Sequence, residues 1–316
     1  MLRYLSPLLA ALVASAAGPN YELSGRMVPR SGAYVSLFGS TVPFSASTLA
    51  DLDGRFHFKK LEPGMYTLSI FSRRRGEARR TVEVGPASAD AKGRVSLTLQ
   101  LKDSDFVFNT ALRRHVVSAR QLAIPESAMR EYREAQKDLS RYNVDSAVKR
   151  LEHAVDLAPQ FSAAWNNLGT IAYQTRKYDR AEECFRMAVE QDSQSYEALV
   201  NLGGVLVTER KLDEAMEYNL KAVLARPNDA LANAQLGMTY FSLGQYDLAV
   251  KYLEHTRQID PANFSYPQLL LFQIYSRRGE RDAAAEALED FLARHPDWPQ
   301  AAKMRETITG LRASSH

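Results

Sequence analysis

Basic side chains are concentrated in one short stretch of the sequence, and their type and spacing point to the binding of anions. Five arginines stand within residues 73–80, namely Arg73, Arg74, Arg75, Arg79 and Arg80. Guanidinium groups bind carboxylates and phosphates through paired, charge-assisted hydrogen bonds. The stretch lies between two β-rich runs, so we expect it at the tip of a hairpin. There it would bind an anionic lipid, lipopolysaccharide or an acidic wall polymer; the alternative is a solvated tip without a ligand.

Residue patterns that support catalysis do not occur in the sequence. None of the six histidines stands in a metal-ligand spacing such as H-E-x-x-H. No glycine-rich phosphate loop, no G-x-S-x-G elbow and no Cys/His nucleophile arrangement is found. Asp51 and Asp53 stand beside Arg55 and supply too few oxygens for a calcium loop, which needs about six or more. We therefore predict a protein that is not an enzyme and that holds neither a metal nor a cofactor.

Short β-rich runs surround the arginines and are the elements that would hold them. Six such runs lie between residues 20 and 102: Tyr21–Gly25, Ala33–Leu37, Arg55–Phe58, Met65–Ile70, Thr81–Val84 and Val95–Leu99. Short strands at regular spacing, separated by Gly and Pro, predict an all-β sandwich over residues 18–102. Asp53-Gly54 favours a hairpin turn, and Pro63-Gly64 favours a type II turn.

Two segments of this β-rich half resemble the carboxypeptidase regulatory-like (prealbumin-like) domain. The family pattern is D-x-D/N-G-x-F followed by L-P-P-G-x-Y-x-L, and the sequence has DLDGRFHF at 51–58 and LEPGMYTL at 61–68. Glu62 replaces the first proline of the pattern. The resemblance implies a β-sandwich, and residues 103–127 would then connect it to the second half.

A fixed period of about 34 residues, the length of a helix–turn–helix repeat, organises the second half of the chain. Four alanines follow it, namely Ala147, Ala181, Ala215 and Ala249, and so do Gly169, Gly203 and Gly237. Each period contains two apolar stretches of helical spacing separated by a short turn. Stacked units of this kind bury their apolar faces only against one another.

The unit Ser162–Ser195 resembles the tetratricopeptide repeat. Its signature places hold Trp165, Leu168, Gly169, Tyr178, Ala181, Phe185 and Ala188, while Ser193 stands at the proline place. We expect repeats over 128–161, 162–195, 196–229, 230–263 and 264–298, a capping helix over 299–312 and a tail at 313–316. The predicted fold is therefore multidomain, an all-β sandwich followed by an α-α superhelical solenoid of five hairpins with a cap.

The resemblance to the tetratricopeptide repeat implies a groove lined by the first helix of each unit. The matching places hold Asn166, Asn167, Thr170, Tyr173, Gln174, Asn201, Val207, Met238, Phe241, Phe272 and Tyr275. No Lys or Arg stands there, so a clamp for a peptide carboxylate is not expected. The amides would bind a peptide backbone and the apolar side chains would form an adaptable wall. Alternatively, the aromatic residues pack against adjacent helices and the asparagines are structural.

The N-terminus has the form of a secretory signal. Arg3 precedes an apolar run, Tyr4–Ala17, which ends in Ala14-Ser15-Ala16, a small-x-small cleavage pattern. We predict a signal peptide over residues 1–17, export to the periplasm or the extracellular space, and no transmembrane span after cleavage. The alternative is an uncleaved N-terminal anchor. The single cysteine, Cys184, excludes an internal disulfide; it is interpreted as a packing residue, with a reactive thiol as the alternative.

Charge divides the chain into two unlike parts. Residues 18–102 carry 13 Lys and Arg against 7 Asp and Glu, a net +6, whereas residues 103–316 carry 26 against 30, a net −4. Export argues against nucleic acid as a partner. Our first hypothesis is an exported, non-enzymatic adaptor or scaffold that binds a protein or peptide in the groove. The alternative is an envelope glycan- or anionic-polymer-binding protein that acts through the β-sandwich, with the solenoid as a spacer.

Overall fold

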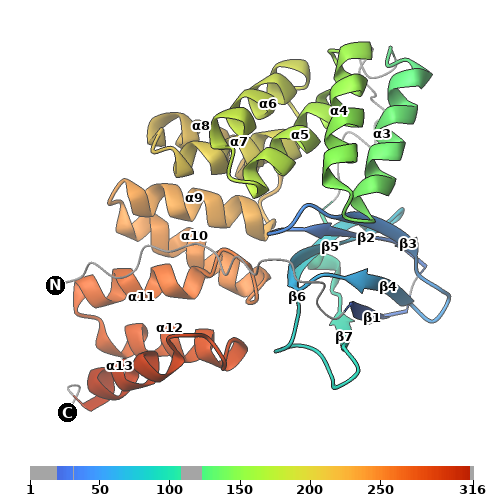
Figure 1. The fold of residues 1–316 in the computed structure, drawn as a ribbon. Helices are drawn as coiled ribbons and strands as arrows, with labels where there is room; N and C mark the ends of the chain where they lie inside the picture. The colour runs from blue at the N-terminus through green and yellow to red at the C-terminus, as the bar shows by residue number, and fades with distance from the viewer. Residues whose placement is uncertain (1–19, 31, 108–122, 314–316) are drawn as a thin grey trace.

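The computed structural model describes residues 20–30, 32–107 and 123–313 of the 316-residue chain. Strands occupy the first part of the chain and helices the second (Figure 1). The predicted signal peptide, most of the connecting segment and residues 314–316 of the tail lie outside the described residues. We refer below to residues 20–107 as the β region and to residues 126–313 as the solenoid.

Seven strands form two sheets in the described part of the β region. The strands are β1 (Tyr21–Val28), β2 (Tyr34–Gly39), β3 (Ser45–Leu49), β4 (Arg55–Leu61), β5 (Gly64–Ser72), β6 (Gly76–Val84) and β7 (Arg94–Gln100). One sheet has the order β4-β1-β7, with β1 and β7 parallel. The other has the order β3-β2-β5-β6, with every neighbouring pair antiparallel.

The two sheets share one hydrophobic core, because alternate residues of each strand point inward. Leu23 of β1, Leu37 of β2 and Leu68 of β5 are all fully buried in this core. Close packing depends on Gly25, since a Cβ there would lie 2.0 Å from the Phe56 ring. The alternation read from the sequence therefore corresponds to a real inside and outside of each strand.

Of the two turns predicted in the β region, one agrees with the structure and the other does not. Gly54 has a φ of +73°, as a turn built on Asp53-Gly54 requires. The type II turn predicted at Pro63-Gly64 is wrong, because Gly64 begins β5 and pairs with Val84 instead of adopting a positive φ. The left-handed residue nearest this connection is Lys60, with a φ of 57°, and it lies within β4 where the pairing with β1 shifts register.

Helices pair in sequence along the rest of the chain. They are α3 (Glu126–Leu139), α4 (Val144–Leu157), α5 (Ser162–Gln174), α6 (Tyr178–Gln191), α7 (Tyr196–Thr208), α8 (Leu212–Ala225), α9 (Ala230–Ser242), α10 (Tyr246–Ile259), α11 (Pro267–Arg278), α12 (Arg281–Arg294) and α13 (Ala301–Ala313). The starts of α5, α7 and α9 are evenly spaced along the chain, and those of α4, α6, α8 and α10 follow with the same spacing as the alanines and glycines of the sequence. The sequence period is thus the period of the helix pairs.

Small residues at the repeating places allow each pair of helices to cross closely. A Cβ added at Gly169 would lie 2.6 Å from the Phe185 ring, and one at Gly203 would lie 2.0 Å from Asn219 Oδ1. In both cases the obstructing side chain belongs to the second helix of the same pair. A glycine is required because any larger residue would push the two helices apart.

The turn inside each helix pair contains one residue in the left-handed region. Tyr142, Arg176 and Arg210 have φ values of 58°, 62° and 65°, and Gly244 and Gly279 hold the corresponding places with 75° and 73°. Only the last two are glycines, for which this conformation carries no steric penalty. The first three were not predicted, because nothing about their residue types marks a left-handed turn.

The helices follow an arc, and the strands lie on its inner side (Figure 1). Helix α3 packs near β3, at one end of the arc. Residues at the ends of α8, α10 and α12 contact β6 farther along. We call the side of the solenoid that faces the strands its inner face.

Candidate functional site on the inner face of the solenoid

Polar side chains on the first helices of neighbouring helix pairs, α3, α5 and α7, are joined by hydrogen bonds. Asn201 Nδ2 of α7 donates to Asn166 Oδ1 of α5 over 3.0 Å and lies 3.5 Å from Thr170 Oγ1. Asn167 Nδ2 donates to the hydroxyl of Tyr132, on α3, over 3.2 Å. Three successive first helices therefore present a connected row of amides and hydroxyls, all of them partly buried.

Tyr173 stands at the more open end of this row. Its hydroxyl lies 3.3 Å from Thr208 Oγ1 of α7, and its ring packs edge-on against Tyr178 with centroids 5.4 Å apart. The residue remains 36% exposed, which is high for an aromatic side chain between two repeats. Tyr132 was missed at the sequence level, although it also lies on the first helix of a pair.

The apolar residues predicted to line the groove lie in packing between repeats. Met238, Phe241, Phe272 and Tyr275 pack, partly buried, against one cluster that includes the buried Leu253. Tyr275 also donates its hydroxyl to Glu254 Oε1 over 3.0 Å. Val207 packs likewise against a neighbouring cluster. In this half of the predicted groove, contact with adjacent helices accounts for the observed placement of the side chains.

The first two helix pairs hold the β region through polar contacts. Gln174 Nε2, at the end of α5, donates to the carbonyl oxygen of Gly39 over 2.8 Å. Tyr142, in the α3–α4 turn, accepts from the main-chain N–H of Glu62 over 2.9 Å, and its hydroxyl lies 2.8 Å from that of Tyr66. Its ring also packs against Phe44, with centroids 4.9 Å apart. One predicted groove residue, Gln174, thus contacts the protein's own β region.

An ion-pair cluster joins β6 to the middle of the solenoid. Arg226, at the end of α8, donates to Glu77 over 2.8 Å and to Glu197 over 3.3 Å. Arg79 completes the cluster, 2.8 Å from Glu77 and 2.7 Å from Glu197. Both guanidinium groups also approach the ring of Tyr196, that of Arg226 to 4.1 Å and that of Arg79 to 5.3 Å from the centroid. The cluster defined by Glu77, Arg79, Glu197 and Arg226 is therefore built from both parts of the chain.

The charges of this cluster stabilise one another. Burial by itself would raise the pKa of Glu77, but Arg79, Arg226 and a hydrogen bond from Ser69 lower the pKa to about 2. Burial likewise opposes ionisation of Glu197, and the same two arginines lower its pKa. Burial would lower the pKa of Arg79, yet Glu77 and Glu197 raise it. Glu77, Glu197 and Arg79 are consequently charged at neutral pH.

Strand β6 makes two more contacts with helix ends. The main-chain N–H of Thr81 donates to Asp260 Oδ2, at the end of α10, over 2.9 Å. Burial raises the pKa of this carboxyl group, which is only 4% exposed. His295 Nδ1, just after α12, lies 3.6 Å from Glu83. Successive helix pairs thus contact successive outward-facing residues of one strand.

This docking changes the interpretation of the arginine cluster predicted as an anion site. Arg73 and Arg74 do lie exposed in the β5–β6 turn, as a hairpin tip requires. Arg79 and Arg80 instead belong to β6, where Arg80 pairs with Asp105 over 2.9 Å and Arg79 with the solenoid. Arg75 pairs with Asp103 over 2.8 Å. Carboxylates of the protein itself therefore occupy three of the five arginines, and a shared anion site at the tip is not supported.

Other chemistry is sparse in the described residues. Cys184 is fully buried in the hydrophobic cluster that also contains Leu151 and Leu168. Burial raises the pKa of its thiol to about 11, which fits a packing residue. Within residues 20–30, 32–107 and 123–313, no group of three His, Cys, Asp or Glu side chains could hold a metal ion. The helices found in these ranges include none that is long and apolar enough to cross a membrane.

Comparisons with known proteins agree with the repeat geometry. The sequence model of the middle TPR-like domain of cilia and flagella-associated protein 70 matches residues 144–260, and that of the tetratricopeptide repeat matches residues 240–308. The human NatA auxiliary subunit N-alpha-acetyltransferase 16 is 29% identical over 130 residues. That alignment covers 40% of this chain but 15% of the human protein, so the chain spans a small part of its curated relative.

Two solved structures share the fold of the solenoid. The type IV pilus biogenesis factor PilW has a TM-score of 0.50 and 21% identity, over 60% of this chain and 92% of its own. PilF of Pseudomonas aeruginosa has a TM-score of 0.50 and 19% identity, over 61% and 90%. Residues 126–313 thus form a tetratricopeptide-repeat solenoid. Such proteins are generally non-enzymatic scaffolds that mediate protein–protein interaction and peptide binding.

Proposed function

We propose that this chain is a non-enzymatic adaptor that binds a protein or peptide on the inner face of its solenoid. The proposal rests on one observation: side chains of this face already bind the main chain of the protein's own β region. Gln174 donates to the main-chain carbonyl of Gly39, and Asp260 accepts from the main-chain N–H of Thr81. Side chains that bond the backbone of an extended segment give affinity without demanding one sequence, which is how peptide-binding surfaces work.

The β region takes only part of the inner face, and the partner binds beside it. The row Asn166, Thr170 and Asn201 offers amide and hydroxyl groups that now bond mainly one another. Tyr173 adds a half-open aromatic surface at the end of the row. A peptide there would exchange side-chain hydrogen bonds for bonds to its backbone and cover the tyrosine ring, the type of anchor that is enriched in protein interfaces.

Export is part of the same proposal and rests on the sequence of residues 1–17 alone. An adaptor that lacks disulfides would depend on the packing of its repeats in an oxidising compartment. Mass measurement of the chain recovered from cells tests cleavage after Ala16 or Ala17. A recovered chain that still begins at Met1 would contradict the signal-peptide prediction and favour the anchor.

The adaptor function is tested by photocrosslinking from the inner face. A photoreactive residue replaces Tyr173 in the full chain, and in a control chain it replaces Leu224, which is 71% exposed on α8. The proposal expects a protein that is captured from position 173 and not from position 224. The purified captured protein should then bind the unmodified chain, and Asn166→Ala/Asn201→Ala should weaken that binding about tenfold, as loss of one or two hydrogen bonds predicts.

Either of two results would contradict the proposal. Equal capture from positions 173 and 224 would indicate nonspecific association rather than a binding site. Unchanged affinity of the purified partner for the Asn166→Ala/Asn201→Ala chain would show that the row of amides does not contact it. Urea unfolding of the variant, followed by the fluorescence of Trp165 and Trp298, establishes that the solenoid is intact in each experiment.

A further inference from the structure

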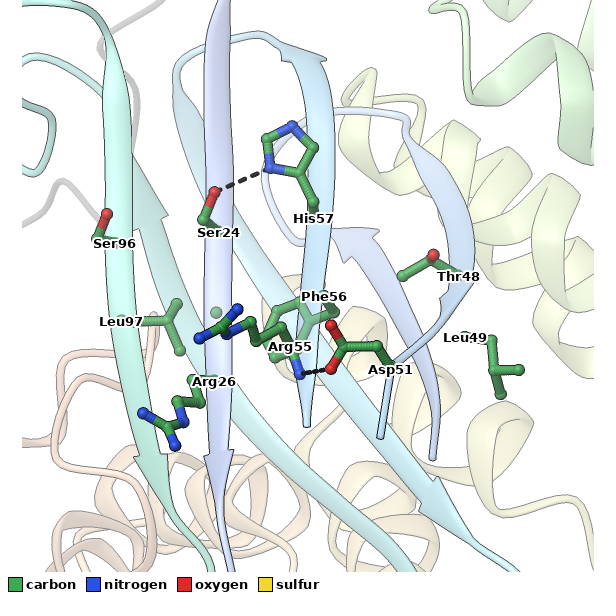
Figure 2. Close-up of a pocket in the computed structure, with 11 residues that line it drawn as sticks. Ser24, Arg26, Thr48, Leu49, Asp51, Arg55, Phe56, His57, Ser96 and Leu97 are labelled. Carbon is green, nitrogen blue, oxygen red and sulfur yellow. Dashed lines mark hydrogen bonds between the residues drawn. The ribbon is translucent and has the colours of Figure 1, made fainter. Parts of the chain in front are cut away.

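An open pocket of about 580 Å³ lies on the three-stranded sheet of the β region. Strands β1, β4 and β7 supply Ser24, Arg26, Arg55, His57 and Ser96 to its lining (Figure 2). The volume falls within the range of about 300–1,000 Å³ usual for small-ligand sites. All its lining residues come from the β region, and none belongs to β6, the strand that contacts the middle of the solenoid.

Two guanidinium groups of this pocket have no partner among the residues that the structure describes. Arg26 and Arg55 stand directly opposite each other in the register of β1 and β4. Neither side chain donates a hydrogen bond or forms an ion pair there, and Arg26 Nε is shielded from solvent while unbonded. By contrast, Arg30, Arg79 and Arg94 of the same β region each pair with a carboxylate.

The carboxylate in the lining does not neutralise this pair. Asp51 Oδ1 accepts from the main-chain N–H of Arg55 over 2.8 Å, which directs it to the turn between β3 and β4 (Figure 2). Like charges directly opposite each other on antiparallel strands are destabilising. An arrangement that costs stability and lacks an internal counterion is expected where an external anion completes it.

Polar side chains at the neighbouring strand positions also line the pocket, and one of them, His57, has Nε2 3.7 Å from the carboxylate of Glu22. Ser24 lies opposite His57 on one side and opposite Ser96 on the other. Its hydroxyl is 2.8 Å from His57 Nδ1. Leu49 and Leu97 add apolar surface to the lining, and Leu49 is 63% exposed. Two guanidinium groups, two hydroxyls and an imidazole thus line the same open pocket as these apolar side chains.

We propose that this pocket binds a small organic anion whose carboxylate or phosphate group lies between Arg26 and Arg55. The planar guanidinium forks suit the paired oxygens of either group. The apolar part of the ligand packs against apolar surface of the lining such as that of Leu97. The pocket shares no lining residue with the predicted groove of the solenoid, so binding there is tested separately from partner binding on the inner face.

Calorimetric titration of the full chain with defined probes tests the site. Phenyl phosphate carries the phosphate, N-acetylphenylalanine carries the carboxylate, and N-acetylphenylalanine amide is the neutral control. We expect saturable binding of at least one anionic probe and at least tenfold weaker binding of the amide. The probe that binds better identifies whether the natural ligand carries a phosphate or a carboxylate. If the two anionic probes bind equally well, the pocket is a site for either group.

Matched variants assign the binding to the pocket. Arg26→Gln/Arg55→Gln should lower the affinity of the anionic probe by about tenfold or more, since charge-assisted hydrogen bonds to both arginines are lost. Arg73→Gln/Arg74→Gln removes the same charge from the exposed β5–β6 turn and should leave the affinity within about twofold. The single variant Arg55→Gln serves if the double variant does not fold.

Three results would overturn the proposal. If neither anionic probe bound at concentrations up to about 10 mM, the pocket would not be a site for carboxylates or phosphates. Binding of the amide as strong as that of the acid would show an apolar site. An equal loss in the two double variants would show attraction by net charge instead of a site. None of these results would bear on the adaptor function.

Discussion

Replacement of Arg226 by methionine tests whether the ion-pair cluster holds the β region against the solenoid. The side chain of Arg226 is 11% exposed and contacts Glu77, Glu197 and the Tyr196 ring. Breaking a buried ion pair costs about 3–5 kcal/mol, because the remaining charge loses its partner. Glu77 keeps Arg79, which favours the lower end of that range, and loss of the cation–π contact adds about 1 kcal/mol. We expect docking to weaken by about 3–4 kcal/mol.

The main-chain N–H of Thr81 reports on docking directly. It donates to Asp260 of the solenoid and not to a neighbouring strand partner, so exchange with solvent requires separation of the two parts. A loss of about 3–4 kcal/mol corresponds to exchange that is on the order of 10²–10³-fold faster. Amides of the β1–β7 ladder should keep their rates, because undocking leaves that sheet intact.

A control substitution at a more exposed arginine separates the effect of the buried cluster from that of losing any ion-paired arginine. Arg186→Met removes an arginine that also pairs with two carboxylates, those of Glu182 and Glu214, but its side chain is 39% exposed. An exposed pair contributes about 0–1 kcal/mol, so Thr81 should exchange nearly as in the unmodified chain. A change below tenfold at Thr81 in Arg226→Met would refute the reasoning. A uniform rise at every amide would attribute the effect to global unfolding instead.

Three further predictions concern single side chains. The folded-state pKa of Glu77, about 2, lies below its ordinary 4.5, so this group stabilises the fold above about pH 4.5 and the contribution, about 3 kcal/mol, is lost as pH falls toward 2. Urea titrations across pH should show this loss in the unmodified chain and little of it in Glu77→Gln. Gly203→Ala should destabilise the solenoid by about 1–3 kcal/mol, because the new Cβ would overlap Asn219; Gly310→Ala, where a Cβ meets no atom within 4 Å, should raise the midpoint or leave it unchanged in the same urea assay. Cys184 should resist a disulfide reagent in the folded chain and react on unfolding, since it is buried with a raised pKa; rapid labelling of the native protein would contradict this placement.

The sequence predicted the repeats well because their signal is local. Gly169 and Gly203 recur at the same place of successive repeats since each must let its own helix pair cross closely. The amphipathic spacing of each helix likewise depends only on its immediate neighbours. The left-handed turns at Tyr142, Arg176 and Arg210 were not predicted, because these residue types do not favour that conformation and the packed helices on either side impose it.

The candidate site was predicted only in part. Asn166, Thr170 and Asn201 do come together, as expected from their equivalent places in the repeat. For Met238 and Phe272 the alternative of packing between helices describes what the structure shows. Gln174 was expected to face a peptide and contacts Gly39 of the protein's own β region. No property of a single repeat indicates which surface another part of the chain will cover.

By itself, the sequence determined the helix pairs, the alternation of the strands and the absence of a recognisable catalytic pattern, because each depends on residues a few positions apart. Only the tertiary structure decided that β6 docks on the solenoid and that Arg79 belongs to an ion-pair cluster. Glu77 and Arg226 are 149 residues apart, and Thr81 and Asp260 are 179 apart. Contacts of that separation leave no periodic trace, since they arise from the fit of two completed surfaces and the burial of their charges.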